Sequence, residues 1–128
     1  MDTTQLLEFD RKHLWHPYAS MTEPPPVNFA VSASGTKIRL ADGSELLDGV
    51  SSWWCMCHGH NHPKIVAAIR EQAAKLSQVM FAGFTHEPAI RLGQPLVESA
   101  PAGLTRVFYA DSGSVAVECA AKMALQYQ

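Results

Sequence analysis

The stretch Arg106-Val107-Phe108-Tyr109-Ala110-Asp111-Ser112-Gly113-Ser114 decides the fold class of this chain. Its first five residues are typical of a short buried strand, and its last four form a turn of small and polar residues. Apolar residues then recur at helical spacing, at Val115, Cys119, Met123 and Tyr127. A strand, a turn and a helix in this order make half of a βαβ unit, so we expect an α/β protein with a parallel sheet here.

The turn from Asp111 to Ser114 is also a candidate phosphate site. Unpaired backbone N–H groups and the helix dipole favour an anion at a helix N-terminus. Gly113 allows a ligand to approach the backbone closely, and the hydroxyls of Ser112 and Ser114 add hydrogen-bonding groups. An ordinary serine cap on a structural helix explains the same residues, because the turn matches neither GxGxxG nor a Walker loop.

Two amphipathic helices are expected before this strand. The first runs from about residue 63 to residue 79, with Asn61 as its N-cap and Pro63 at its first position. Thr85 is expected to cap the second helix, and Pro95 predicts a kink inside it.

Residues 27–48 predict a small antiparallel meander, because apolar and polar residues alternate on both sides of the Asp42-Gly43 turn. A short helix is expected before it, ending ahead of Pro17. After the meander, the tandem indoles of Trp53 and Trp54 suit either a ligand wall or the filling of a core.

The segment from Cys55 to His62 holds two cysteines and three histidines, which are ligand types that zinc takes. Their spacing departs from finger and ribbon patterns. Two half-buried thiols beside polar histidines explain the segment better than a metal site does.

Composition narrows the class of protein. The 128 residues carry 10 basic and 12 acidic side chains, a formal charge of −2, and 47% of them are apolar. This composition argues against global disorder, and it gives no electrostatic reason to bind nucleic acid or an anionic membrane. The sequence shows no secretory signal. It also has no apolar run of the roughly 20 residues that a membrane helix needs. Three cysteines, an odd number, favour a cytoplasmic location. The last helix has no stop signal, so we expect a longer protein.

Several motifs together resemble one family. In chain order they are Trp15-His16-Pro17-Tyr18, Ser51-Ser52-Trp53-Trp54, His58-Gly59 with His62-Pro63, Val79-Met80-Phe81, Thr85-His86, Asp111-Ser112-Gly113-Ser114-Val115 and Ala121-Lys122-Met123-Ala124-Leu125-Gln126-Tyr127. They resemble the N-terminal third of the class III aminotransferases, which are fold-type I enzymes that depend on pyridoxal 5'-phosphate (PLP). The aromatic motifs resemble the branch that serves biotin biosynthesis.

The resemblance implies roles for six residues. Gly113 and Ser114, with Ser112 beside them, match positions that hold the PLP phosphate. The aromatic residues that match the substrate pocket are Tyr18, Trp53 and Trp54. The reaction implied is amino transfer from S-adenosylmethionine to 8-amino-7-oxononanoate, which gives 7,8-diaminononanoate.

The same resemblance implies that no catalytic residue lies in this chain. The family's Schiff-base lysine and the acid that pairs with the pyridine nitrogen lie beyond residue 128, so the chain alone is expected to be inactive. Residues 1–60 would form the N-terminal segment with the meander, as part of a small domain. Residues 61–128 would begin the large PLP-binding domain, truncated here. A homodimer is implied, with the loop 81–86 reaching the partner's site.

Some residues depart from the family pattern. Cys55 and Cys57 stand where small or aliphatic residues are usual, and His60 often has a tyrosine counterpart, so no metal site is expected. Ala82 stands in a loop that commonly has two glycines, and Pro95 has no counterpart. Three alternatives remain open: an aminotransferase for another ω-amine, a non-catalytic Cys/His metal-binding fragment, and a remnant that only dimerises.

Overall fold

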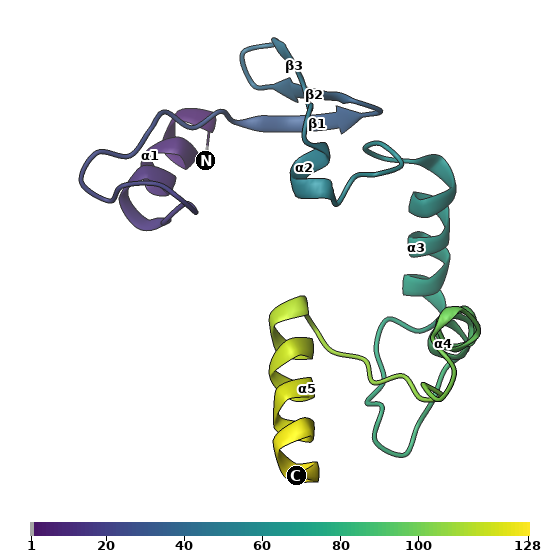
Figure 1. Ribbon diagram of the computed structural model, residues 1–128. Coiled ribbons are helices and arrows are strands. Elements are labelled where there is room, and N and C mark those ends of the chain that lie inside the picture. The colour runs from purple at the N-terminus through teal and green to yellow at the C-terminus, as the bar shows by residue number, and fades with distance from the viewer. Residues whose placement is uncertain (1) are drawn as a thin grey trace. The chain divides into compact units, whose positions relative to one another are not determined.

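The computed structural model describes residues 2–128 (Figure 1). The chain folds as two compact units, Met1–Ser77 and Gln78–Gln128. Its helices and strands are α1 (Thr3–His13), β1 (Ala30–Ser34), β2 (Lys37–Leu40), β3 (Glu45–Leu47), α2 (Ser51–Trp54), α3 (Pro63–Lys75), α4 (Glu87–Ser99) and α5 (Gly113–Tyr127). No helix within residues 2–128 combines the length and the apolar character needed to cross a membrane. The expected division at residues 60 and 61 stays a prediction.

The first unit begins with the expected short helix. The Asp2 carboxylate accepts the Gln5 N–H at 2.9 Å while the Gln5 side chain accepts the Asp2 N–H at 3.1 Å, which is a capping box. The helix ends at His13, ahead of Pro17, and the next residue, Leu14, has extended backbone with a ψ of 127°. This confirms the helix and its end.

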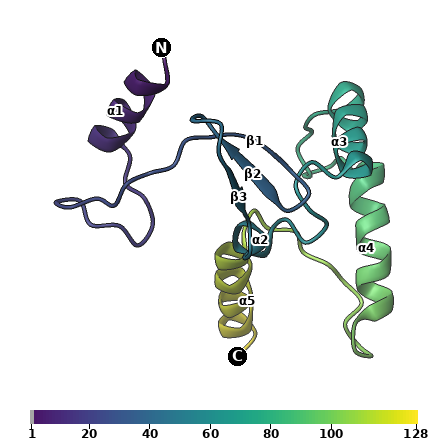
Figure 2. The same ribbon diagram turned by 90° about the horizontal axis from the view of Figure 1, so that it is seen from above.

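The meander is confirmed. Three antiparallel strands pair in the order β1-β2-β3, and Figures 1 and 2 show them side by side with α2 following β3. The first strand starts at Ala30, later than the expected residue 27. In the turn before β3, the Asp42 carboxylate accepts the N–H and the hydroxyl of Ser44, at 2.9 and 2.6 Å, and Gly43 has a φ of +87°.

Two expected caps are wrong. The N-cap of α3 is His62, because Asn61 has a left-handed φ of +53° and uses its side chain to donate to the Ala33 carbonyl at 2.6 Å. The helix ends at Lys75 rather than near residue 79. In the second unit, His86 and not Thr85 caps α4, and its ring accepts the Ala89 N–H at 3.4 Å.

Residues 106–110 do not form the expected strand, although α5 follows them as expected. A strand exists only through hydrogen bonds to a neighbouring strand, and no second strand lies beside this segment within residues 2–128. Pro95 lies inside α4, which continues through it to Ser99.

Large apolar side chains remain exposed in both units, and Leu40 is the one hydrophobic residue within 2–128 that is buried. Hydrophobic burial within each unit therefore contributes little stability. Local order depends more on hydrogen bonds such as those that join Gly35 and His60. The Gly35 N–H donates to the His60 carbonyl at 3.0 Å, and the His60 N–H donates to the Gly35 carbonyl at 2.8 Å.

This contact brings Gly59 against Gly35, and it leads to a prediction. A Cβ at position 59 would lie 3.2 Å from both Cα and the carbonyl oxygen of Gly35, and Gly59 has a φ of +81°. We expect Gly59→Ala to lower the free energy of unfolding by about 1–3 kcal/mol, as strain and overpacking usually do. Urea unfolding followed by circular dichroism measures this. Gly49→Ala is the matched control, because a Cβ there meets open space; equal midpoints for the two variants would contradict the prediction.

Candidate functional site

In the second unit, the start of α5 combines a cap with open amides. The Ser112 hydroxyl accepts the Val115 N–H at 3.3 Å and the Ser112 carbonyl accepts the Ala116 N–H at 2.9 Å. The N–H groups of Gly113 and Ser114 have no partner within residues 2–128. A Cβ added at Gly113 would meet nothing within 4 Å, so the approach is open. The serine-cap interpretation is thus correct for Ser112, and it leaves two amides and the helix dipole available to an anion.

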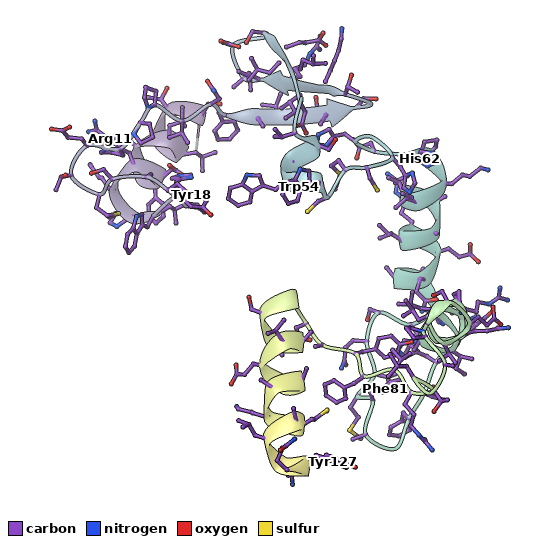
Figure 3. All side chains as sticks on the ribbon, in the orientation of Figure 1. Arg11, Tyr18, Trp54, His62, Phe81 and Tyr127 are labelled. Atoms are coloured by element: carbon purple, nitrogen blue, oxygen red, sulfur yellow. The ribbon has the colours of Figure 1, made fainter. Side chains whose placement is uncertain are left out.

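An apolar cavity of about 720 Å³ lies in the same unit and reaches this turn at Asp111. The Tyr109 hydroxyl donates to the Ala89 carbonyl at 2.7 Å, which ties the segment before the turn to α4. The Phe81 ring meets the rings of Tyr109 and His86 edge-on, with centroids 6.0 and 5.8 Å apart. Figure 3 shows Phe81 among the side chains that surround α4. The lining consists of Val79, Phe81, Ala82, His86, Pro88, Ala89, Leu92, Val107, Phe108, Tyr109, Ala110 and Asp111.

In the first unit, the tandem indoles lie on a turn of unusual backbone. The residues of α2, Ser51 to Trp54, have φ values of 49°, 46°, 56° and 67°, so this turn is left-handed. Tyr18, the third aromatic residue of the expected substrate pocket, also has a left-handed φ of 59°. A left-handed residue other than glycine costs about 1–2 kcal/mol, and such strain is typical of functional sites.

The aromatic residues of this unit are open to solvent. The rings of Tyr18 and Trp53 meet edge-on with centroids 5.9 Å apart. The exposed fractions are 99% for Tyr18 and 86% for Trp54, so these side chains fill no core within residues 2–128 (Figure 3). An exposed, rigid aromatic pair favours the ligand-wall interpretation. Its role in binding substrate stays a prediction.

Asp48 anchors the turn, and sequence reasoning missed it. Its carboxylate accepts the Ser52 N–H at 3.0 Å and the Ser52 hydroxyl at 2.8 Å, and it lies 2.7 Å from Nε2 of His60. The Asp48 side chain is 5% exposed and that of His60 is 15% exposed. The only signal in the sequence is an aspartate four residues before a serine, which is too common to single out.

These bonds lower the pKa of the Asp48 carboxyl group. The backbone N–H of Ser52 lowers the pKa of Asp48 most, followed by His60 and then the Ser52 hydroxyl, and together they bring it from 3.8 to about 2. The carboxylate stays ionised to a lower pH than an ordinary aspartate, and its charge strengthens the hydrogen bonds that it accepts.

The lowered pKa of Asp48 predicts a loss of stability in acid. A folded-state pKa of about 2, below the ordinary 3.8, gives stability that is fully present above pH 3.8 and is lost as pH falls towards 2. We expect urea midpoints of the unchanged protein to fall over this range, and those of Asp48→Asn to fall less. The pKa values of Asp42 and Glu45 are also lowered, mainly by side-chain bonds to Ser44 and Lys37. These two groups contribute the same pH dependence of stability to both proteins. Parallel pH profiles would contradict the prediction.

The cysteine and histidine side chains of residues 55–62 make separate contacts. Cys55 and Cys57 are free and exposed, and His60 bonds to Asp48. The rings of His58 and His62 meet edge-on with centroids 6.1 Å apart. No three histidine, cysteine or acidic side chains within the described part of the chain converge as a metal site would require.

The second unit thus holds the expected phosphate residues, Ser112, Gly113 and Ser114, side by side at the start of α5. The first unit holds the expected substrate residues: Tyr18 contacts Trp53, and Trp54 lies on the same turn as Trp53. That both groups serve one site stays a prediction.

Residues 18–128 match the family Aminotransferase class-III. The chain is 52% identical over 121 residues to the adenosylmethionine-8-amino-7-oxononanoate aminotransferase of Buchnera aphidicola subsp. Baizongia pistaciae, covering 94% of this chain and 28% of that relative. It is 55% identical over 115 residues to the enzyme of the same name from Synechococcus elongatus, covering 90% of this chain and 27% of the relative. The chain therefore spans less than a third of the length of these relatives.

Solved structures agree with these relatives. The adenosylmethionine-8-amino-7-oxononanoate aminotransferase of Methanocaldococcus jannaschii superposes with a TM-score of 0.91 at 38% identity, over 98% of this chain and 29% of that one. The taurine:2-oxoglutarate aminotransferase of Bifidobacterium kashiwanohense, solved with PLP and glutamate, gives 0.85 at 29% identity, over 97% of this chain and 27% of that one.

Proposed function

Because this chain belongs to the class III aminotransferases, enzymes of fold-type I, we propose that it forms the amino-terminal part of an enzyme that acts in biotin biosynthesis. The enzyme would move an amino group from S-adenosylmethionine to 8-amino-7-oxononanoate and give 7,8-diaminononanoate. Relatives at 52% and 55% identity carry the corresponding name. The observation that carries the proposal is the start of α5, where two unpaired amides and a capped helix offer an anion site in a chain of this family.

The residues at this site fit a PLP phosphate. In the proposal, the N–H groups of Gly113 and Ser114 donate to the phosphate, the Ser114 hydroxyl adds a donor, and the helix dipole favours the negative charge. Ser112 keeps the turn in shape because its hydroxyl is bonded to the Val115 N–H. When bound, PLP supplies the electron sink that amino transfer needs.

The proposal assigns the exposed aromatic residues to the substrates. Tyr18, Trp53 and Trp54 offer flat apolar faces to the aliphatic chain of the keto substrate and π faces to the sulfonium cation of the donor. Long apolar substrates need such a wall because their chains offer few polar atoms to recognise.

The lysine that binds the cofactor covalently is proposed to lie outside these 128 residues. Three of the five lysines are paired here with carboxylates: Lys12 with Glu8, Lys37 with Glu45, and Lys122 with Glu118, at 2.7, 3.0 and 2.6 Å. We expect the 128-residue chain to be inactive alone. Borohydride reduction of the chain with PLP, followed by mass spectrometry, tests this, and PLP fixed stoichiometrically on one of its lysines would contradict it.

The proposal extends to assembly and location. A homodimer is proposed from the resemblance of the loop 81–86 to one that reaches a partner's site, with small molecules as the other partners and no nucleic acid or membrane. A cytoplasmic location is proposed because the three cysteines, Cys55, Cys57 and Cys119, are free.

Amino transfer by the full-length protein that contains these residues tests the function. The protein, loaded with PLP, is incubated with S-adenosylmethionine and 8-amino-7-oxononanoate, and 7,8-diaminononanoate is expected by mass spectrometry. Turnover with an ω-amino acid as donor, and none with S-adenosylmethionine, would favour the ω-amine alternative. Stoichiometric zinc that is lost in a variant with Cys55→Ser and Cys57→Ser would favour the metal-binding alternative.

A further inference from the structure

The left-handed turn of α2 has few contacts of its own. Its closing bonds run from the Trp54 N–H to the Val50 carbonyl and from the Met56 N–H to the Ser51 carbonyl, both at 3.0 Å, and from the Cys55 N–H to the Ser52 carbonyl at 3.4 Å. Neither indole N–H has a hydrogen-bond partner within residues 2–128, and the Trp53 ring contacts only Tyr18 among aromatic side chains there. Within residues 2–128, hydrogen bonds therefore act on the two indoles only through the backbone of the turn.

The Asp48 side chain forms a hydrogen bond with the backbone of this turn. Its carboxylate holds both the N–H and the hydroxyl of Ser52, the residue directly before Trp53, at 3.0 and 2.8 Å. Ser52 is the residue with the lowest left-handed φ of the turn, 46°. A nearly buried carboxylate with two bonds to one residue gives that residue a single orientation.

Asp48 is itself fixed to the sheet at two points. Its N–H donates to the Thr36 carbonyl at 2.8 Å. Its carboxylate lies 2.7 Å from His60 Nε2, and His60 forms two backbone hydrogen bonds with Gly35. Gly35 and Thr36 make the turn between β1 and β2. Asp48 therefore connects the turn that carries the indoles to the meander.

We propose that Asp48 is a positioning residue of the enzyme, which holds Ser52 and thereby the left-handed turn that presents Trp53 and Trp54 to the substrates. This inference rests on the proposed function for the role of the two indoles. His60 supports the same arrangement from the other side of the carboxylate.

The test compares two aspartates with matched bonds. Asp48→Asn removes the charge that accepts the N–H and hydroxyl of Ser52, whereas Asp42→Asn removes the charge that accepts the N–H and hydroxyl of Ser44, at the turn before β3. Both are made in the full-length protein labelled with 5-fluorotryptophan. The ¹⁹F resonances of Trp53 and Trp54 are assigned by single Trp→Phe replacements.

In Asp48→Asn we expect both resonances to shift or broaden and KM for 8-amino-7-oxononanoate to rise about tenfold, with kcat changed less than about threefold, because lost uniform binding appears in KM. Asp42→Asn should leave the resonances in place and KM within about twofold. His60→Gln retains the bonds from Asp48 to Ser52, and it serves as a milder variant with a smaller change in the same direction.

The outcomes separate this inference from the proposed function. Unchanged resonances in Asp48→Asn would overturn the inference, whatever the activity. Shifted resonances with KM equal to that of Asp42→Asn would also overturn it, while amino transfer by the unchanged protein would leave the proposed function intact. An unchanged protein without amino transfer would contradict the proposed function, and the resonances would still report whether Asp48 holds the turn.

Discussion

Ser114→Glu is expected to weaken PLP binding by the full-length protein about 100-fold or more while α5 keeps its stability. The substitution places a carboxylate beside the two open amides at which the phosphate is proposed to bind. Two unit charges 4 Å apart repel by about 4 kcal/mol at an effective dielectric of 20. A 100-fold loss corresponds to about 2.7 kcal/mol, so repulsion alone is sufficient. The first turn of α5 contains no acidic residue at present, and an acid there stabilises a helix by about 0.3–1 kcal/mol.

Ser114→Glu should lower PLP affinity without lowering the stability of α5. Unfolding therefore cannot account for a loss of PLP binding in this variant. Fluorescence titration of the apoprotein gives the PLP dissociation constant, and far-ultraviolet circular dichroism on heating gives the stability. Ser114→Ala should lose only the hydroxyl contact, about tenfold in affinity. Gln126→Glu puts the same charge at the other end of α5 and should leave PLP affinity unchanged. If Ser114→Glu binds PLP as tightly as the unchanged protein, the phosphate lies elsewhere.

Trp53→Ala and Trp54→Ala are each expected to lower kcat/KM for 8-amino-7-oxononanoate about 100-fold and to leave the PLP dissociation constant within about twofold. Removing an indole from a binding surface typically costs about 2–4 kcal/mol. The cofactor is proposed to bind at α5, so its affinity should not depend on the aromatic wall. Steady-state kinetics with S-adenosylmethionine as donor measure the effect.

Trp15→Ala is the matched control for these indoles. Trp15 is also exposed, at 73%, and its indole N–H donates to the Ala19 carbonyl at 3.1 Å, but within residues 2–128 its ring does not join the ring contact between Tyr18 and Trp53. Its loss should change kcat/KM less than about threefold. Equal losses in all three variants would show that the tryptophans act through folding, and the assignment of the substrate wall would fail.

Local patterns predicted much of the fold. The short first helix, the meander and the helix after Gly113 were expected from capping residues, alternation and helical spacing, and the structure confirms them. The family and its fold-type I class were recognised from motifs and are confirmed by the match over residues 18–128. Each of these features depends on residues that are close in sequence.

Two of the wrong predictions, the strand at residues 106–110 and the Asn61 cap, depend on a partner distant in sequence. Residues 106–110 have strand propensity, but strand pairing needs a neighbour that residues 2–128 do not place there. Asn61 has the chemistry of a cap, yet its amide is bonded to Ala33, 28 residues away. Propensity describes what a residue favours on its own, and a hydrogen bond from elsewhere outweighs it.

The amino-acid sequence by itself determined the family, the capped start of α5 as a candidate anion site and the presence of a tandem indole pair, because these depend on residue types at short spacing. Only the tertiary structure decided the left-handed conformation of Ser51–Trp54 and the use of Asp48 and His60 to hold it. Left-handed backbone is unfavourable for every one of those four residues taken singly. It persists because bonds from a carboxylate fixed to the β1–β2 turn compensate for the strain, and such bonds arise only once the chain has folded.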